Sequence, residues 1–363
     1  MGDLGTDLPL IAAMIIAAKL DAASVLILFG ALQIMTGLVY RMPMPVQPLK
    51  AMAAIVIAQK LSPETLYGGG LAIGIMVLVL AASGALGWLA KTIPTPVVRG
   101  VQFGLGMNLA TLAGKEFIAP SDAAGWALAA VSIALVFGLW GNRRVPAALV
   151  VVGLGAVYSG IFDMDWAKLA AGVGFALPQT HVPQWSDIMT GLVVLALPQL
   201  PLSLANSLLA THRLAKDLFP ERAPSMRKLG LTYSFMNLVS PFLSGIPVCH
   251  GSGGMAGHYA FGARVGASVV IYGLFYLISG LFFSESFHTL IMIFPKAILG
   301  VLLFIEGLAL MRRVSISGLD ARGWMTTLIT GLCAVGLPNG YLIGVAAGWV
   351  VFAISKNWEL ERD

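Results

Sequence analysis

Charged residues are scarce in this sequence. Only 11% of its 363 residues are Asp, Glu, Lys or Arg, whereas 58% are hydrophobic. In soluble domains roughly a quarter of all residues are charged, and they cover the surface. The low charge content therefore excludes a soluble globular chain. The composition predicts an all-α polytopic membrane protein lying in the lipid bilayer. The net charge of +5 fits basic cytoplasmic loops, and we expect no nucleic-acid partner.

Cysteines and the usual catalytic motifs are also scarce. The two cysteines, Cys249 and Cys333, stand in apolar surroundings, which excludes a disulfide framework. No metal-ligand spacing, phosphate-binding loop or serine elbow occurs, so we expect no metal and no cofactor. The adjacent Cys249 and His250 are a remote candidate for a membrane-embedded enzyme. Their side chains are not expected to converge and no acid orients the histidine, so we expect no catalytic residue.

Apolar runs bounded by proline, glycine and charge predict about fourteen membrane crossings. They span 5–18, 22–40, 45–60, 66–90, 96–113, 123–140, 146–160, 188–211, 226–242, 249–262, 266–283, 287–311, 322–336 and 339–355. The polar stretch Asp163–Asp187 divides them into two equal sets. Lys and Arg gather in alternate loops, so the positive-inside rule predicts a multi-pass protein of the inner or plasma membrane with both termini cytoplasmic. The acidic start Met1–Asp7 argues against a cleavable signal peptide.

Two predicted crossings are broken at matching places. Pro45-Val46-Gln47-Pro48 and Gly245–Gly254 both contain a Pro-Val pair, then polar or glycine residues, then a small-residue helix. Each lies in the third crossing of its half, and Asp7-Leu8-Pro9-Leu10 of the first half matches Gln199-Leu200-Pro201-Leu202 of the second. Halves with an odd number of crossings run in opposite directions, which predicts a 7+7 inverted repeat, a common layout of secondary transporters.

The broken segments predict an anion site. Proline lacks an N–H group and keeps the preceding residue extended, so helices are expected to begin only near Pro48 and His250. Two half-helix N-termini, each with about half a positive charge, would then face each other at mid-membrane. The predicted substrate-binding residues on these segments supply side-chain donors or a close approach to backbone N–H groups. They are Pro45, Val46, Gln47, Cys249, His250, Gly251, Ser252 and Gly253.

Five further polar residues in apolar segments are candidates for function. Gln199 and Asn206 share a helix face, and either bind substrate or join helices by hydrogen bonds. Asp7 is a coupling group or a helix-start acid in a wet interface. Glu306 pairs with Lys296 or carries a coupling proton. Lys50 points at the anion or, in the favoured interpretation, extends toward water.

Three motifs resemble the molybdate transporter family, which is related to the SulP sulfate permeases. They are Gly2–Thr6 with Leu8-Pro9-Leu10, Pro43–Lys50, and Pro247–Arg264. The resemblance runs nearly end to end. It implies an oxyanion held between the third and tenth crossings, and frequent homodimers among relatives. SulP permeases carry a C-terminal STAS domain that has no counterpart here, so regulation through it is not expected.

The resemblance also implies a division into core and gate domains. The core would comprise 1–95 and 187–284, and the gate 96–186 and 285–363. Many relatives have an acidic residue where Asn206 stands, and the resemblance leads us to expect an apolar or aromatic residue where Asp7 stands. Three alternatives for the driving force therefore stay open: protons carried by Asp7, Glu306 or a histidine, Na⁺, and exchange without a coupling ion.

The leading hypothesis is a secondary transporter of molybdate or sulfate. A nucleobase or bicarbonate permease of the same architecture is the alternative. A nucleobase site needs carboxylates for the ring N–H groups, and the tenth-crossing motif has none.

Overall fold

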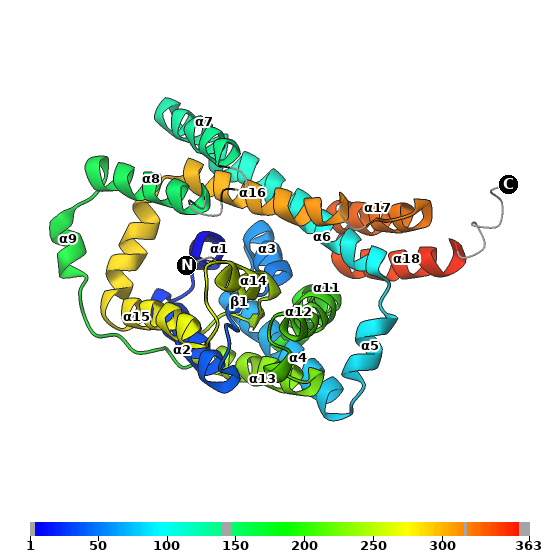
Figure 1. Cartoon of the computed structure of the whole chain (residues 1–363). Helices are drawn as coiled ribbons and strands as arrows, with labels where there is room; N and C mark the ends of the chain where they lie inside the picture. The colour runs from blue at the N-terminus through cyan, green and yellow to red at the C-terminus, as the bar shows by residue number, and fades with distance from the viewer. Residues whose placement is uncertain (1–3, 140–141, 143–144, 146, 316–317, 356–363) are drawn as a thin grey trace.

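The computed structural model describes residues 4–139, 142, 145, 147–315 and 318–355 of the chain, which fold almost entirely into helices (Figure 1). The elements are α1 (Leu4–Ala18), α2 (Ala22–Tyr40), β1 (Val46–Pro48), α3 (Lys50–Gln59), α4 (Pro63–Ala82), α5 (Leu86–Thr92), α6 (Thr95–Leu112), η1 (Ala113–Ile118), α7 (Ala123–Gly138), α8 (Ala147–Phe162), α9 (Trp166–Ala171), α10 (Trp185–Gly191), η2 (Leu192–Ala196), α11 (Leu197–Leu202), η3 (Ser203–Leu209), α12 (Ala210–Leu218), η4 (Pro220–Arg222), α13 (Met226–Val239), η5 (Ser240–Leu243), β2 (Val248–His250), α14 (Ser252–Ala260), α15 (Ala267–Ile293), α16 (Lys296–Ser315), α17 (Ala321–Gly336) and α18 (Gly340–Ile354).

Every predicted crossing has helical structure, but two boundaries were wrong. The predicted run 66–90 is two helices, because α4 ends at Ala82 and Gly84 takes a positive φ of 76° before α5 begins. The predicted break between 283 and 287 is only a kink at Phe283, and α15 continues to Ile293. The chain breaks at Pro295 instead, immediately before α16.

The topology remains a prediction at two points. Within the described residues, four helices are both long and apolar enough to cross a membrane: Ala22–Tyr40, Pro63–Ala82, the composite helix Trp185–Leu218, and Ala267–Ile293. The helices of the other predicted crossings are either shorter, like α3 with 10 residues, or less apolar, like α16 with 20 residues. Four of the charges used to orient the chain lie outside the described residues: Arg143, Arg144, Lys356 and Arg362. Both chain ends also lie outside them.

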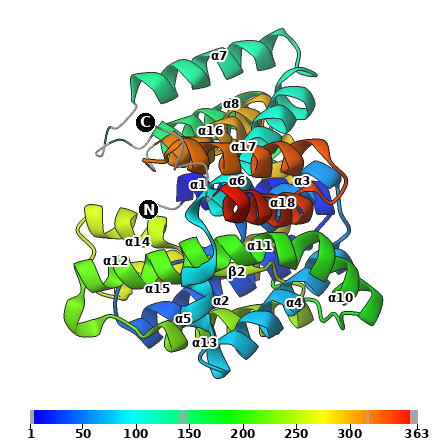
Figure 2. The ribbon, with the colours of Figure 1, turned by 90° about the vertical axis from the view of Figure 1, so that its right-hand side faces the viewer.

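The helices form two packed groups. In one group α6 packs on α16, α17 and α18, and α7 also contacts α16. In the other, α2 packs on α15, and α4 packs on α10 and α13. Figures 1 and 2 show these groups on opposite sides of the molecule, with α3 and α11 between them. Glycines allow close contact within the second group, since a Cβ on Gly30 of α2 would lie only 2.5 Å from the Leu277 backbone nitrogen of α15.

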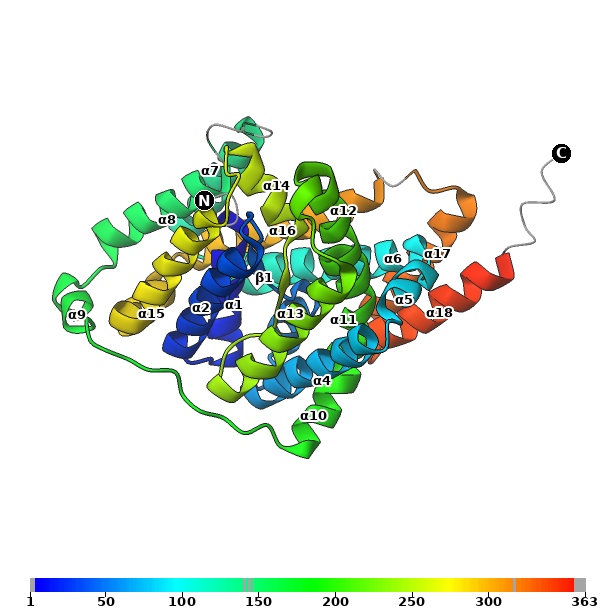
Figure 3. The ribbon, with the colours of Figure 1, turned by 60° about the horizontal axis from the view of Figure 1, so that its bottom comes forward.

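The predicted polar stretch between the halves crosses the surface of the second group. After α9 it runs extended to α10 (Figure 3). The N–H groups of Gly174 and Ala176 donate to Phe282 and Leu281 of α15, at 3.0 and 2.8 Å. These bonds satisfy backbone groups that no regular element would pair.

The two broken segments meet as a short antiparallel sheet. Its register pairs Val46 with His250, Gln47 with Cys249, and Pro48 with Val248. Two flanking bonds extend the pairing: Leu49 N–H donates to the Pro247 carbonyl, and Gly251 N–H to the Pro45 carbonyl, both at 3.1 Å. Because Pro45 matches Pro247 and Leu49 matches Gly251 in the two motifs, these two bonds are related by an approximate two-fold axis. This is the relation that an inverted repeat requires.

Candidate functional site

The sheet is held on both edges by amide side chains in matching positions. Gln33 of α2 accepts from the Val46 N–H at 2.9 Å and donates to its carbonyl at 2.7 Å. Asn237 of α13 does the same for Val248, at 2.9 and 2.7 Å. Each amide satisfies two backbone groups that would otherwise be unpaired in an apolar setting. Each lies in the helix just before its broken segment, so the clamps share the repeat symmetry.

The N-terminus of α3 is already capped. The helix begins at Lys50 after Leu49, two residues later than predicted, because Pro48 belongs to β1. The N–H groups of Ala51 and Met52 donate to Gln199 Oε1, at 2.9 and 3.2 Å. The Gln199 amide thus satisfies two of the free donors of this first turn. Gln199 therefore links α11 to α3 by hydrogen bonds and also lines the cavity.

The N-terminus of α14 opens into a cavity. The helix begins at Ser252 after Gly251, again two residues later than predicted, because His250 belongs to β2. The first backbone hydrogen bond of the helix runs from the Met255 N–H to the Gly251 carbonyl, at 2.9 Å. A Cβ on Gly253 would meet nothing within 4 Å, so the backbone there borders open space. First-turn N–H groups of a helix have no carbonyl within the helix to accept them.

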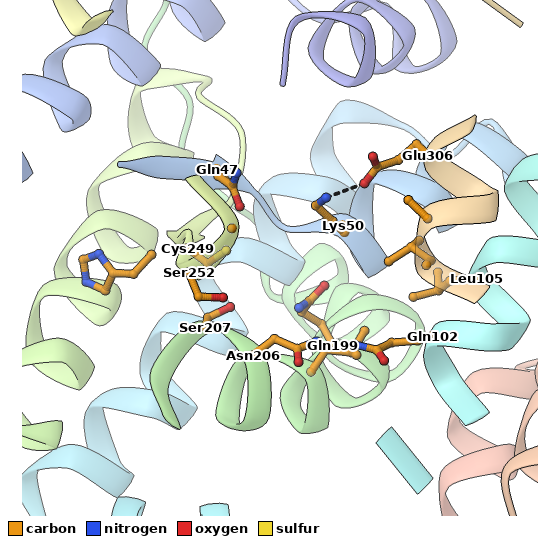
Figure 4. Close-up of a pocket in the computed structure, with 15 residues that line it drawn as sticks. Gln47, Lys50, Gln102, Leu105, Gln199, Asn206, Ser207, Cys249, Ser252 and Glu306 are labelled. Atoms are coloured by element: carbon orange, nitrogen blue, oxygen red, sulfur yellow. Dashed lines mark hydrogen bonds and ion pairs between the residues drawn. The ribbon is translucent and has the colours of Figure 1, made fainter. Parts of the chain in front are cut away.

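The cavity has a volume of about 280 Å³ and lies between the two helix groups (Figure 4). Its lining comes from the two broken segments, from α11 and η3, and from α6 and α16: Gln47, Lys50, Cys249, His250, Ser252, Gly253; Gln199, Leu202, Asn206, Ser207; Gln102, Leu105; Glu306, Ala309 and Leu310. A water molecule takes about 30 Å³ of liquid volume, so the space suits a small ion with some water.

Most of the predicted site residues are among this lining, and four are not. Val46 belongs to β1 and Pro45 directly precedes it, and the backbone of both is used in hydrogen bonds that hold the sheet. Gly251 lies beneath Gln47. A Cβ on Gly251 would come 2.5 Å from Gln47 Cδ, so only glycine leaves room for this side chain. The fourth, Asp7, lies elsewhere.

His250 borders the cavity, but its ring has partners elsewhere, so its predicted role as a side-chain donor to the anion stays a prediction. Side chains alternate along a strand, so Gln47 and its partner Cys249 face one side while His250 faces the other. His250 Nε2 lies 2.7 Å from Thr232 Oγ1 of α13, and its ring packs edge-on against Tyr40. The same alternation separates Cys249 from His250, which removes the basis of a catalytic pair.

Lys50 and Glu306 form an ion pair across the cavity (Figure 4). The favoured interpretation that Lys50 extends toward water is therefore wrong, and so is the pairing of Glu306 with Lys296. The sequence separation of 256 residues hides this contact from any local pattern. Among the described residues of the lining, Lys50 carries the one formal positive charge and Glu306 the one formal negative charge.

Gln102 of α6 is a site residue that the sequence reasoning missed. It is 1% exposed, and its Oε1 accepts from Arg99 at 2.9 Å. That contact orients the amide, and leaves the buried Nε2 donor without a hydrogen-bond partner in the described structure. Buried amide donors are nearly always satisfied, so this one is available to a water molecule or a ligand in the cavity. An amide within the apolar run 96–113 was the available signal.

Asp7 lies outside the cavity. It is 1% exposed, so the wet helix-start interpretation is wrong. Tyr272 of α15 donates to Asp7 Oδ2 at 3.2 Å, and the hydroxyl groups of Tyr272 and Tyr276 lie 3.2 Å apart. Asp7 and the two tyrosine hydroxyl groups thus form a buried polar cluster between α1 and α15.

The fold matches that of the membrane domains of two solved transporters. The transmembrane domain of the cyanobacterial bicarbonate transporter BicA superposes with a TM-score of 0.71 at 16% identity, covering 96% of each chain. Murine SLC26A9, an anion transporter in an inward-facing state, gives 0.70 at 15% identity, over 100% of this chain and 68% of that one. At these identities the likeness concerns the fold.

Sequence comparison identifies the family. The profile described as "Molybdate transporter of MFS superfamily" matches residues 1–109 and 191–310, which include both broken segments. Molybdate transporter 2 of Arabidopsis thaliana is 32% identical over 98% of this chain and 86% of its own length. Molybdate transporter 1 of Chlamydomonas reinhardtii is 28% identical over 95% and 89%. The chain belongs to the molybdate transporter family, which confirms the predicted resemblance and the transporter class.

Proposed function

We propose that this protein is a secondary transporter of a tetrahedral oxyanion, molybdate or sulfate, bound in the cavity between α3 and α14. The observation that carries the proposal is the open N-terminus of α14 facing the Lys50 ammonium across that cavity. A helix N-terminus and a cation together favour an anion. The relatives named as molybdate transporters support the choice of substrate.

The anion would be bound mainly by neutral donors. The backbone N–H groups of Ser252 and Gly253 and the side-chain amides of Gln47 and Gln102 border the cavity. Gln199 already shields the α3 N-terminus, so its dipole would act on the anion through the amide group rather than by direct N–H contact. Neutral donors and one paired cation give an affinity that permits release, which transport requires.

The cavity position also suggests how transport would occur. Gln102 and Glu306 belong to helices α6 and α16 of one packed group. The half-helix α14 packs on α12 and is joined to α3 through the small sheet, whereas α3 itself contacts both α1 and α6. A sliding or rocking movement of the predicted core (1–95 and 187–284) against the predicted gate (96–186 and 285–363) would expose the cavity to each side in turn. We further propose location in the cytoplasmic membrane with both termini inside, coupling to H⁺ or Na⁺, and assembly as a homodimer.

Uptake into proteoliposomes tests the function. We expect accumulation of molybdate that excess sulfate inhibits, in vesicles with an imposed H⁺ or Na⁺ gradient. Binding to the purified protein, measured by calorimetry, should give an affinity for at least one of the two anions. Absence of both uptake and binding, combined with transport of bicarbonate or uracil, would replace the proposal by the alternative permease.

A further inference from the structure

Glu306 lies between two cavities. In the proposed oxyanion cavity its carboxylate forms the ion pair with Lys50, and the side chains of Glu306 and Lys50 are 12% and 30% exposed. A second cavity, of about 80 Å³, is bordered by α1, α7, α8 and α16. Among the described residues, Glu306 is the one that lines both cavities. Its carboxyl group therefore borders free space other than the space that an oxyanion would occupy.

The second cavity is suited to an uncharged group. Apart from Glu306, the described residues of its lining have apolar side chains, such as Leu10 of α1, Val136 of α7 and Ala148 of α8. A carboxylate without a cation is strongly disfavoured in apolar surroundings, whereas a protonated carboxyl group carries no charge and is tolerated. A Glu306 side chain that turned from Lys50 into this cavity would therefore be stable only with a proton.

The charges that line the empty oxyanion cavity are balanced. Lys50 and Glu306 carry the formal charges of its described lining, one of each sign, and they contact each other. A divalent oxyanion changes this balance, because it brings two negative charges close to the third negative charge of Glu306. Both side chains of the pair are largely removed from water, so this repulsion is weakly screened.

A proton on Glu306 would remove the repulsion. A nearby negative charge favours the neutral form of a carboxyl group. The oxyanion also competes for the Lys50 ammonium, which stabilises the charged form of Glu306 in the empty cavity. Both effects act in the same direction, whether Glu306 stays beside the oxyanion or turns toward the second cavity. Oxyanion binding therefore favours proton uptake at Glu306.

The other titratable groups near Glu306 are less suited to take up this proton. In the described lining of the two cavities they are Lys50, Cys249 and His250. Lysine and the thiol of cysteine already carry their protons at neutral pH. The Nε2 atom of His250 lies 2.7 Å from Thr232 Oγ1, on the side of the strand opposite to Gln47.

Charged residues of the helices packed on α16 have separate surroundings, and none of those described lines either cavity. Arg99 of α6 donates to Gln102, and Asp7 of α1 accepts from Tyr272, whereas the charged residues of η1 are exposed: Lys115 and Glu116.

We propose that Glu306 takes up a proton when the oxyanion binds beside Lys50, so that H⁺ and the oxyanion bind together. This inference rests on the proposed oxyanion site and deepens it, since it selects H⁺ from the two proposed coupling ions and assigns a residue to it. Linked binding is reciprocal. A lower pH therefore tightens oxyanion binding, and the oxyanion in turn draws a proton into the protein.

Calorimetry counts the protons directly. Wild-type protein is titrated with molybdate at neutral pH in two buffers of different ionisation enthalpy, which gives the number of protons taken up per bound anion. We expect about one proton for the wild type and about zero for E306Q. E306D keeps a carboxyl group and should retain the uptake. E116Q removes the acid of the exposed pair Lys60–Glu116 and should match the wild type.

The pH dependence of the dissociation constant is a second readout. Between about pH 8 and pH 6 the wild-type Kd for molybdate should fall by up to about tenfold per pH unit, which is the limit for one linked proton. Sulfate should show the same slope, because neither anion takes up a proton itself in this range. In E306Q, which resembles the protonated residue, the Kd should stay within about twofold over the same range.

The outcomes separate the inference from the function. If wild-type protein binds molybdate without proton uptake, or if E306Q keeps the wild-type uptake, the inference is refuted and the transporter proposal stands. Uptake that persists in E306Q and disappears in H250Q would assign the proton to the histidine. If wild-type protein binds neither molybdate nor sulfate, the proposed function itself fails. Should E306Q not fold, uptake that H250Q abolishes and E306D retains would refute the inference equally well.

Discussion

Replacing Gln199 by glutamate would place a full negative charge on the first turn of α3. The Gln199 Oε1 atom already accepts from Ala51 and Met52, at 2.9 and 3.2 Å, and a carboxylate oxygen accepts equally well. Gln199 Nε2 donates to Ser203 Oγ at 3.1 Å, and that hydroxyl lies 2.7 Å from Tyr233. Both hydroxyl groups can rotate to donate toward a carboxylate. The fold should therefore tolerate the change.

The effect on anion binding should be large. The free energy of unfolding should also fall, because Gln199 is buried and a carboxylate at its position is desolvated. A carboxylate at a helix N-terminus stabilises the helix by about 0.3–1 kcal/mol. At an effective dielectric constant of about 20, a unit charge about 8 Å from a divalent anion weakens its binding by about 4 kcal/mol. Water in the cavity screens part of this repulsion. We expect the dissociation constant for molybdate to rise at least about a hundredfold, or about 2.7 kcal/mol.

Calorimetry on wild type and Q199E would measure this, together with thermal unfolding to verify the fold. Q59E is the matched control, because Gln59 lies exposed at the far end of the same helix. It should leave molybdate affinity within about twofold, since an exposed charge at that separation is screened. Wild-type affinity in a folded Q199E protein would show that the anion does not bind near α3, and would refute the proposed site.

Three further substitutions test individual contacts. G251A should reduce molybdate affinity about tenfold or more, because the new Cβ would lie 2.5 Å from Gln47 Cδ, whereas G153A has open space and should have no effect on binding. Q102A should weaken binding about tenfold, because it removes a donor that has no partner in the described structure, and should lower the unfolding temperature slightly through loss of the Arg99 bond; a wild-type Kd would remove Gln102 from the site. H250F should lower the free energy of unfolding by about 1–2 kcal/mol through loss of the Thr232 bond, with affinity nearly unchanged; loss of binding in a folded protein would restore the histidine as a direct donor.

The broken helices were predictable because their causes are local. Proline removes an N–H group wherever it stands, and glycine permits close approach, so the Pro-Val and glycine pattern marks both half-helices without any knowledge of packing. The positions of Gln47 and Ser252 in the cavity follow from that pattern. The start of each helix was misplaced by two residues, since pairing between the two strands extends the non-helical segments, and that pairing is a tertiary contact.

The remaining features depend on contacts between distant segments. Nothing local indicates that Glu306 of α16 meets Lys50, or that Gln102 of α6 faces the half-helices. The alternation that turns His250 away from the cavity requires a strand, whereas the sequence favoured the start of a helix. Asp7 was predicted as a coupling residue from its acidity alone, and its tyrosine partners come from a helix near the other end of the chain.

The crossed bonds of the small sheet tie the two halves of the chain together at the place where cargo would sit. Leu49 is held by Pro247, and Gly251 by Pro45, so neither half-helix can shift along its axis without drawing the other with it. A substrate bound to both half-helices would thus move together with them as one rigid unit, and its contacts with them would stay the same throughout the transport cycle. Only the side of the cavity that α6 and α16 form, with Gln102 and Glu306, would change its position relative to the substrate.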